Sequence, residues 1–239
     1  MPIIYEPRGK AREYSPLAAN LYRGCSHGCV YCYAPSATFT DRAKFAKPYR
    51  RKNVIEQIEK EAPQYRNDPR PILLCFTCDP YQPKEDVFNI TRQGLKIFTE
   101  NKCTVQVLTK GGTRACRDFD LLSQNPLNSF GTTLTFDNPT QSIEWEPKAA
   151  LPDDRIEALK IAHEAGIKTW VSFEPVIEPE QVYRLIKKTH AFVDLYKVGK
   201  LNYHPRAKEI DWRTFRIKAE SILNSLQKDY YIKIDLQKF

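Results

Sequence analysis

Apolar and polar positions alternate along the chain with two periods, one typical of strands and one typical of helices. Short apolar runs predict strands over residues 20–24, 71–76, 104–109, 130–136, 168–173 and 192–198. Apolar residues three and four positions apart predict helices over residues 53–62, 89–100, 114–122, 152–165, 180–190 and 211–228. Strands that alternate with helices predict an α/β fold with a parallel sheet and right-handed crossovers. Two architectures stay open, a barrel and an open doubly wound sheet.

The two ends of the chain depart from this alternation. Residues 1–19 hold three prolines and little periodicity, which predicts an extended arm lying over the domain. Residues 205–239 predict a C-terminal helical extension, within which residues 230–236 alternate as an edge strand does. The chain of 239 residues has a length common among single-domain α/β barrels. We expect one domain over residues 1–239, present as a monomer.

The composition predicts a globular protein of the cytoplasm. Apolar residues make up 41% of the chain and charged residues 28%, and no apolar run approaches the length of a membrane span. The first residues lack the charged-then-apolar order of a secretory signal. We therefore expect no membrane association.

The net charge of +8 favours a polyanionic partner such as DNA or RNA. Part of this charge lies in residues 36–52, where cations and aromatic residues are interleaved: Arg42, Lys44, Lys47, Arg50, Arg51 and Lys52 with Phe39, Phe45 and Tyr49. Such a segment suits phosphate contact combined with base stacking. The alternative is a solvated helix face whose aromatic side chains point into the core.

Three of the seven cysteines, Cys25, Cys29 and Cys32, lie in one loop at the spacing C-x3-C-x2-C. An odd number of cysteines, three of them clustered, favours a metal centre and free thiols over a disulfide framework. An iron–sulfur cube normally takes four cysteine ligands, so three would leave one iron open to a ligand that is not protein. The alternative is a structural zinc loop with His27 or a distant cysteine as fourth ligand, but His27 lies too close to both flanking cysteines to chelate easily with them.

This spacing, with the aromatic Tyr31 just before the third cysteine, resembles the signature of the radical S-adenosylmethionine (SAM) enzymes. In that family the amino and carboxylate groups of SAM chelate the open iron of a [4Fe-4S] cluster. An electron from the reduced cluster then splits the sulfonium and releases a 5′-deoxyadenosyl radical. The resemblance implies these two cofactors, a partial (β/α)6 TIM-like barrel with a C-terminal helix, and an electron donor such as flavodoxin or ferredoxin.

Within the family, the chain is most similar to the branch that includes spore photoproduct lyase, also described as DNA repair photolyase-like. Five segments beyond the cysteine loop carry this likeness: CDPYQP at 78–83, VLTKG at 107–111, FGTTLTF at 130–136, VSFEP at 171–175 and KVGKLNY at 197–203. The likeness implies a lyase-type reaction in DNA repair or modification.

A SAM site should offer a cation, an acceptor, groups that bind hydroxyls and a flat apolar surface. The resemblance implies that Lys110 meets the SAM carboxylate and that Thr133, or its same-face neighbour Thr135, lies near the same ligand. Asp79 occupies the position where many relatives bind the ammonium group through a Gly-Gly-Glu motif, which this chain lacks. The plain alternatives are an exposed loop lysine, an ordinary strand threonine and an aspartate that starts a turn with Pro80.

Three further side chains complete the expected cofactor site. Glu174 ends a predicted strand and is expected to reach the ribose hydroxyls or the substrate. A carboxylate at such a barrel position needs a partner. Tyr31 and Tyr33 are expected to flank the adenine.

Cys75 and Cys78 form a C-x2-C pair at the end of the second predicted strand. In spore photoproduct lyase a cysteine in this region returns a hydrogen atom to the substrate radical, which the weak S–H bond allows. We expect this role for Cys78, which is nearer the carboxyl end, rather than Cys75. Strand alternation would direct the two thiols to opposite faces if the strand continued that far. Cys75 otherwise reads as a core residue.

Three functions follow from these observations. The first is a radical SAM enzyme that acts on nucleic acid. The second keeps this chemistry but moves it to a protein or a small molecule. The third is a non-catalytic, metal-stabilised module that binds nucleic acid.

Overall fold

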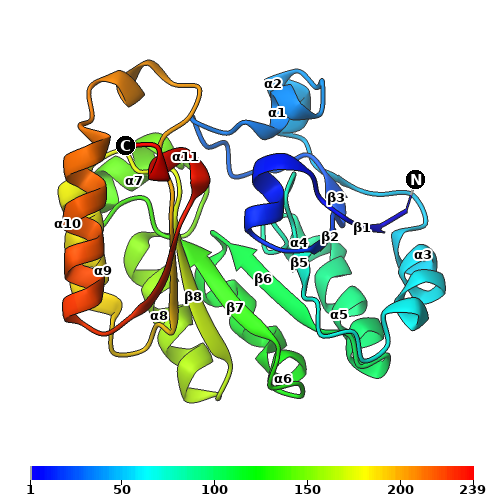
Figure 1. Ribbon diagram of the computed structural model, residues 1–239. Helices are drawn as coiled ribbons and strands as arrows, with labels where there is room; N and C mark the ends of the chain where they lie inside the picture. The colour runs from blue at the N-terminus through cyan, green and yellow to red at the C-terminus, as the bar shows by residue number, and fades with distance from the viewer. Residues whose placement is uncertain (1) are drawn as a thin grey trace.

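The structure is a computed structural model that describes residues 2–239. Its main sheet has eight strands in the order β1-β2-β5-β6-β7-β8-β9-β10. Their bounds are β1 (Ile4–Tyr5), β2 (Leu17–Ala19), β5 (Ile72–Leu74), β6 (Val105–Thr109), β7 (Ser129–Thr133), β8 (Lys168–Phe173), β9 (Leu195–Val198) and β10 (Asp229–Ile232). The strands from β2 to β10 are parallel, and β1 is antiparallel to β2 (Figure 1).

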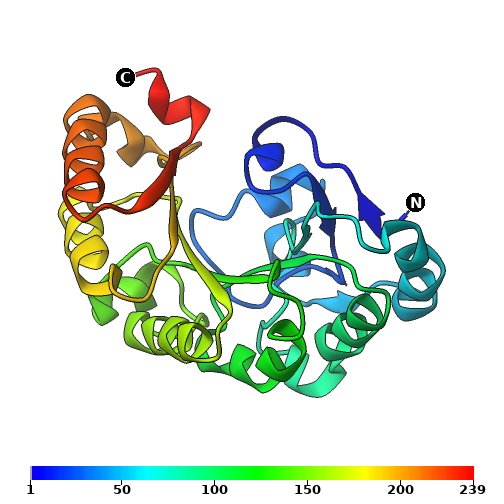
Figure 2. The same cartoon turned by 60° about the horizontal axis from the view of Figure 1, so that its bottom comes forward.

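Helices cover the outer face of this curved sheet (Figure 2). The α-helices are α1 (Ala34–Ala37), α2 (Arg42–Phe45), α3 (Val54–Glu61), α4 (Glu85–Phe88), α5 (Ile90–Glu100), α6 (Phe119–Leu122), α7 (Pro139–Trp145), α8 (Pro152–Glu164), α9 (Pro179–Thr189), α10 (Trp212–Ser225) and α11 (Ile234–Gln237). The 3-10 helices are η1 (Gly9–Glu13), η2 (Ala62–Tyr65), η3 (Gly112–Asp118) and η4 (Pro205–Lys208). From residue 2 to residue 239, no helix combines the length and the apolar character needed to cross a membrane.

The sheet curves without closing, because β1 and β10 form its two edges. The predicted α/β class is therefore confirmed, and the architecture is a partial barrel rather than a flat doubly wound sheet (Figure 2). The parallel strands number seven instead of six, because β10 pairs with β9.

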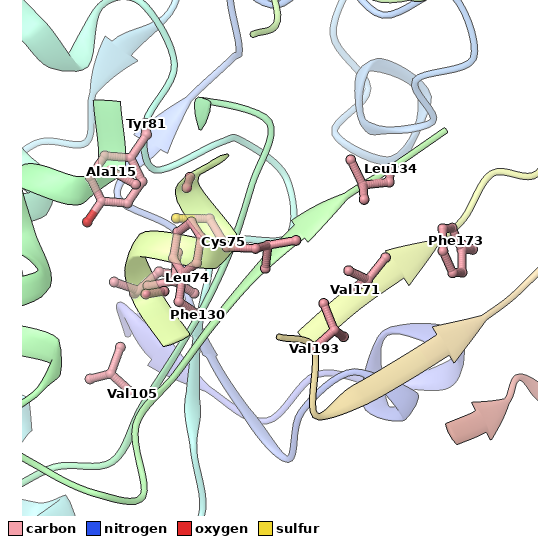
Figure 3. Packing of buried hydrophobic residues seen from close by; sticks show 14 of the residues in the cluster. Leu74, Cys75, Tyr81, Val105, Ala115, Phe130, Leu134, Val171, Phe173 and Val193 are labelled. Atoms are coloured by element: carbon pink, nitrogen blue, oxygen red, sulfur yellow. The ribbon is translucent and has the colours of Figure 1, made fainter. Parts of the chain in front are cut away.

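Successive residues of the strands face two different environments, as strand alternation requires. One set packs under the helices in the main core, where Figure 3 shows Val105, Phe130 and Val171. The other set lies on the concave inner face, where Leu73 and Trp170 form a smaller cluster. The concave face leads to the carboxyl ends of the strands, where barrel enzymes place their chemistry.

The prediction of an extended arm over residues 1–19 was wrong for its last three residues. Residues 17–19, placed in an extended arm, form β2 inside the sheet, because this short apolar run pairs with β5 and is fully buried. The strand predicted from residue 20 is replaced by β3 (Tyr22–Arg23), which pairs with β4 (Tyr49–Arg50) in a separate two-stranded sheet. The cysteine loop still follows the first parallel strand.

Two other boundaries differ from the prediction. Strand β7 ends at Thr133 instead of residue 136, so the residues after it belong to a loop. The alternating segment predicted as an edge strand over residues 230–236 divides into β10 and the short helix α11. Residues 205–239 thus add a strand to the sheet as well as helices.

Candidate functional site

A cavity of about 490 Å³ opens at the carboxyl ends of the parallel strands. It gathers eleven of the twelve side chains that the sequence predicted for the site: Cys25, Cys29, Tyr31, Cys32, Tyr33, Cys75, Cys78, Asp79, Lys110, Thr133 and Glu174. The twelfth, Thr135, is fully buried outside this lining, because the strand stops at Thr133 and the same-face alternation stops with it.

The cysteine loop has a fixed backbone. The Arg42 guanidinium of α2 donates to the carbonyls of Val30 (2.9 Å), Cys32 (3.0 Å) and Cys29 (3.3 Å). At the start of the loop, Gly24 has a φ of +84°, and a Cβ there would lie 2.4 Å from the Phe45 carbonyl oxygen. Only glycine fits this approach, so the sequence itself fixes how the loop leaves β3.

The three loop thiols are unoxidised and line one cavity. Burial raises the pKa of Cys25 well above its usual value and that of Cys29 to about 12, so a cluster would have to displace their protons. Among residues 2–239, no three His, Cys, Asp or Glu side chains converge closely enough to hold a single metal ion.

His27 is a buried, neutral histidine beside this loop. Burial lowers its pKa to about 4, and its Nδ1 lies 3.5 Å from Asp79 Oδ2. Its Nε2 has no hydrogen-bond partner in the described part of the chain. His27 lines the cavity but is only 2% exposed.

Asp79 ties two strand ends together. Its Oδ1 accepts from Thr109 Oγ1 (2.6 Å) and from the Tyr81 N–H (2.8 Å), and its Oδ2 accepts from the Lys110 N–H (2.7 Å). These bonds fit an aspartate that shapes a turn. Its contact with a SAM ammonium group stays a prediction.

Lys110 places a cation in the cavity at the end of β6. Its carbonyl accepts from the Ala150 N–H (2.9 Å), and its ammonium lies 5.6 Å from the centre of the Tyr31 ring, within cation–π range. Over the described residues no carboxylate lies within 4 Å of this ammonium. Its charge is therefore free to meet an anionic group.

Behind Tyr31 lies an ion pair that the sequence analysis missed. Glu146 and Arg155 are both about 1% exposed, with Oε2 and Nη2 2.5 Å apart. Burial acts to raise the pKa of Glu146, but the charges of Arg155 and Lys110 outweigh it and hold that pKa below its usual value. The Tyr31 hydroxyl and Thr135 Oγ1 (3.2 Å) both donate to Glu146 Oε1.

Glu174 stands at the end of β8 with partners from distant parts of the chain. Its carboxylate accepts from the Tyr14 hydroxyl (2.6 Å), the Lys233 ammonium and the Asn202 amide (3.4 Å). A Cβ at Gly199 would lie 2.8 Å from Glu174 Cδ, so a larger residue there would displace the Glu174 carboxylate. The expected partner exists, but no local pattern in the sequence links it to Tyr14 or Lys233.

Cys75 and Cys78 line the same cavity, in contrast to the directions that continued alternation would give. Strand β5 ends at Leu74, so strand alternation no longer sets the side-chain directions of residues 75–78. Burial raises the pKa of Cys75, and the neighbouring Cys78 thiol raises it further. Between them, the N–H groups of residues 76 and 77 both donate to Asn20 Oδ1 (2.9 Å each), which fixes this loop.

A second hollow, of about 810 Å³, opens at the amino ends of the strands. Trp170 lines it, and the indole packs against Tyr14 with ring centres 6.2 Å apart. All seven cysteines lie within the described residues and none of them lines this hollow. Five of the seven cysteines line the cavity at the carboxyl ends of the strands instead.

Some of residues 36–52 fit the interpretation as a nucleic-acid contact, and others fit the interpretation as a helix face with core aromatic residues. Phe45 is buried as a core residue, whereas Phe39 is fully exposed and Tyr49 about half exposed. Arg42 holds the cysteine loop and Arg51 donates to the Asn20 carbonyl (3.3 Å), so both have structural roles. The remaining cations, Lys44, Lys47, Arg50 and Lys52, are exposed.

Comparison with known proteins places this site in a family. Residues 19–193 match the family model described as the radical SAM superfamily. An uncharacterized protein of Methanocaldococcus jannaschii is 28% identical over 186 residues, which cover 77% of this chain and 69% of that protein. The radical SAM Nα-GlyT isomerase of Pseudomonas phage M6 is 27% identical over 177 residues, 73% of this chain but only 35% of the phage protein.

Solved structures show the same fold at low sequence identity. A spore photoproduct lyase variant with bound AdoMet and dinucleoside spore photoproduct has a TM-score of 0.73 at 14% identity, covering 95% of this chain and 78% of that one. Streptococcus suis SuiB bound to S-adenosylmethionine has a TM-score of 0.66 at 13% identity, covering 90% and 49%. The family model, which matches most of the chain, decides the assignment: the chain belongs to the radical SAM superfamily, and its fold is similar to that of spore photoproduct lyase.

Proposed function

We propose that this protein is a radical SAM enzyme that acts on nucleic acid, in DNA repair or modification. The observation that carries the proposal is the single cavity in which Cys25, Cys29 and Cys32 meet the unpaired cation of Lys110. The three thiolates would hold a [4Fe-4S] cluster and leave one iron for SAM. With both bound, reductive cleavage of SAM would supply a 5′-deoxyadenosyl radical.

The chain's own residues have distinct tasks in binding SAM. Lys110 would pair with the SAM carboxylate, and Thr133 would offer its hydroxyl beside it, since both line the cavity. Tyr31 and Tyr33 present flat aromatic rings there for the adenine. Glu174, held by three partners, presents a fixed acceptor for hydroxyl groups.

The Cys75–Cys78 pair would quench the substrate radical. One hydrogen atom moves from sulfur to the substrate, the S–H bond breaks, and a thiyl radical remains on the protein. An electron and a proton, the electron coming from the flavodoxin- or ferredoxin-type donor, return the thiyl to a thiol. Cys78, which is more exposed than Cys75, is the expected donor.

The charge of the site supports an anionic substrate. Five cations but only two carboxylates line the cavity: Arg8, Lys10, Lys110, Lys200 and Lys233 against Asp79 and Glu174. Beside the cysteine loop, the exposed cations and the exposed rings of Phe39 and Tyr49 suit phosphates and bases. The likeness to a lyase solved with a dinucleoside adds to this support.

Elemental analysis of protein purified without oxygen tests the cofactor. We expect iron and sulfide in the wild type and their loss in Cys25→Ala. Zinc in place of iron and sulfide would support the non-catalytic module instead.

Binding of oligonucleotides at several salt concentrations tests the substrate class. We expect log K to fall by about 0.7 to 0.9 per engaged phosphate for each unit of log salt. The double variant Lys47→Gln, Arg50→Gln should flatten this slope, because both side chains are exposed beside the cysteine loop. The control variant Lys96→Gln, Lys187→Gln removes the same charge from α5 and α9 and should leave the slope unchanged. A flat response in the wild type would favour a protein or small-molecule substrate.

A further inference from the structure

Neither Glu146 nor Arg155 lines the cavity, yet this buried pair contacts two of the residues assigned to SAM, Tyr31 and Thr133. The Tyr31 hydroxyl donates to Glu146, and Arg155 Nη1 donates to the Thr133 carbonyl (2.9 Å). Arg155 Nε donates to the carbonyl of Ala150 (2.7 Å). The pair therefore joins β7 to the cysteine loop and to the segment that follows α7.

The segment of residues 145–150, named here the strap, runs along the cysteine loop and is bonded to it. Val30 N–H donates to the Trp145 carbonyl (2.9 Å), and the Lys148 N–H donates to the His27 carbonyl (3.0 Å). At its end, the Ala150 N–H donates to the Lys110 carbonyl (2.9 Å). The strap thus fixes the backbone on both sides of the space between the cysteines and Lys110.

We infer that Glu146 and Arg155 are positioning residues for SAM. They fix the strap and the Tyr31 ring beside the cysteine loop, and the strap and the ring in turn set the position of the Lys110 ammonium. Tyr31 is the link, because its hydroxyl is fixed by Glu146 while its ring face receives the Lys110 ammonium at 5.6 Å. This inference rests on the proposed function.

The physical basis is the charge of the pair. A carboxylate accepts a stronger hydrogen bond from a tyrosine hydroxyl than a neutral amide does. Glu146→Gln keeps the shape of the side chain and removes this charge. Tyr31→Phe removes only the hydroxyl that connects the Tyr31 ring in the cavity to Glu146. Glu144→Gln is the matched control, because Glu144 lies two residues away in α7 and is exposed.

The experiment uses the full chain reconstituted with iron and sulfide, and it measures iron content, SAM affinity and the change that SAM causes in the electron paramagnetic resonance spectrum of the reduced cluster. We expect Glu146→Gln and Tyr31→Phe to retain wild-type iron content but to bind SAM about 10-fold more weakly, as for residues that orient ligands from behind. The spectral change caused by SAM should shrink in both variants and stay intact in Glu144→Gln.

Two results would overturn the inference. One is SAM affinity within twofold of wild type in both variants. The other is joint loss of iron and SAM binding in both, which would show that the pair only maintains the fold. A wild type that holds iron but binds no SAM would instead overturn the proposed function and the inference with it.

Discussion

At the scale of single residues, close contacts decide which positions accept a side chain and which require glycine. Gly131 lies on the inner face of β7, where a Cβ would come within 2.4 Å of the buried Trp170 ring. We expect Gly131→Ala to lower the free energy of unfolding by about 1–3 kcal/mol, because the added methyl group would displace the large, buried Trp170 indole from its packed position. Urea unfolding measures this change.

Gly94→Ala is the control for that prediction. A Cβ at Gly94 would meet only ordinary contacts, the nearest at 3.5 Å, and alanine favours a helix over glycine. Its stability should therefore equal or exceed that of the wild type. Equal losses in the two variants would contradict the account of Gly131.

The positions of side chains were predictable where a motif fixed them. The cysteine spacing located the loop, and the strand-end positions located Lys110 and Glu174 in one cavity. Tyr14 and Glu146 were missed because their roles come from contacts with residues more than 100 positions away. No local pattern encodes such contacts.

At the scale of elements, the short helix α2 acts as a support for the cysteine loop. Its Arg42 donates to three loop carbonyls, a geometry that the planar guanidinium allows and a lysine ammonium does not reproduce. We expect Arg42→Lys to fold normally but to lose iron several-fold faster to a chelator than the wild type. Lys44→Gln, on the same helix and exposed, should match the wild type. Equal iron release from all three proteins would show that the loop needs no such support.

Several helices were predictable from the period of their apolar residues. Helices α5, α8 and α9 lie within one residue of their predicted bounds, whereas α10, predicted to reach residue 228, ends at Ser225. Strand β2 was missed because three residues are too few to show a period. Its place in the sheet depends on pairing with β5, which comes more than 50 residues later.

At the scale of the whole molecule, a segment near the N-terminus, which includes η1, contacts a segment near the C-terminus, which includes α11, on the open side of the barrel. Figure 2 shows these two segments on either side of the opening. Lys10 pairs with Asp235, and Glu13 accepts from the Ile234 N–H (2.7 Å). Lys197 donates to the Tyr14 carbonyl (2.6 Å) at the same junction. The N-terminal segment therefore serves as a lateral wall of the barrel.

This junction predicts a pH dependence of stability. Burial, with the nearby Lys233 charge, lowers the pKa of Lys197 from 10.5 to about 8. Between these values the unfolded chain binds more protons than the folded chain. The free energy of unfolding therefore rises with pH from about 8 to 10.5. As pH falls again through 8, the stability gained over this window is lost. Lys197→Met should flatten the stability curve over this window by about 1–3 kcal/mol relative to wild type. Parallel curves for the two proteins in urea unfolding would contradict the prediction.

Reductive cleavage of SAM is the measurement closest to the central claim. Protein reconstituted with iron and sulfide would be reduced with dithionite and given SAM, and 5′-deoxyadenosine would be quantified by chromatography and mass spectrometry. We expect 5′-deoxyadenosine and methionine in equal amounts from the wild type and from Lys44→Gln, and neither from Cys25→Ala or Cys32→Ala. Equal SAM cleavage by the wild type and the cysteine variants, or none by a wild type that holds its full cluster, would contradict the account.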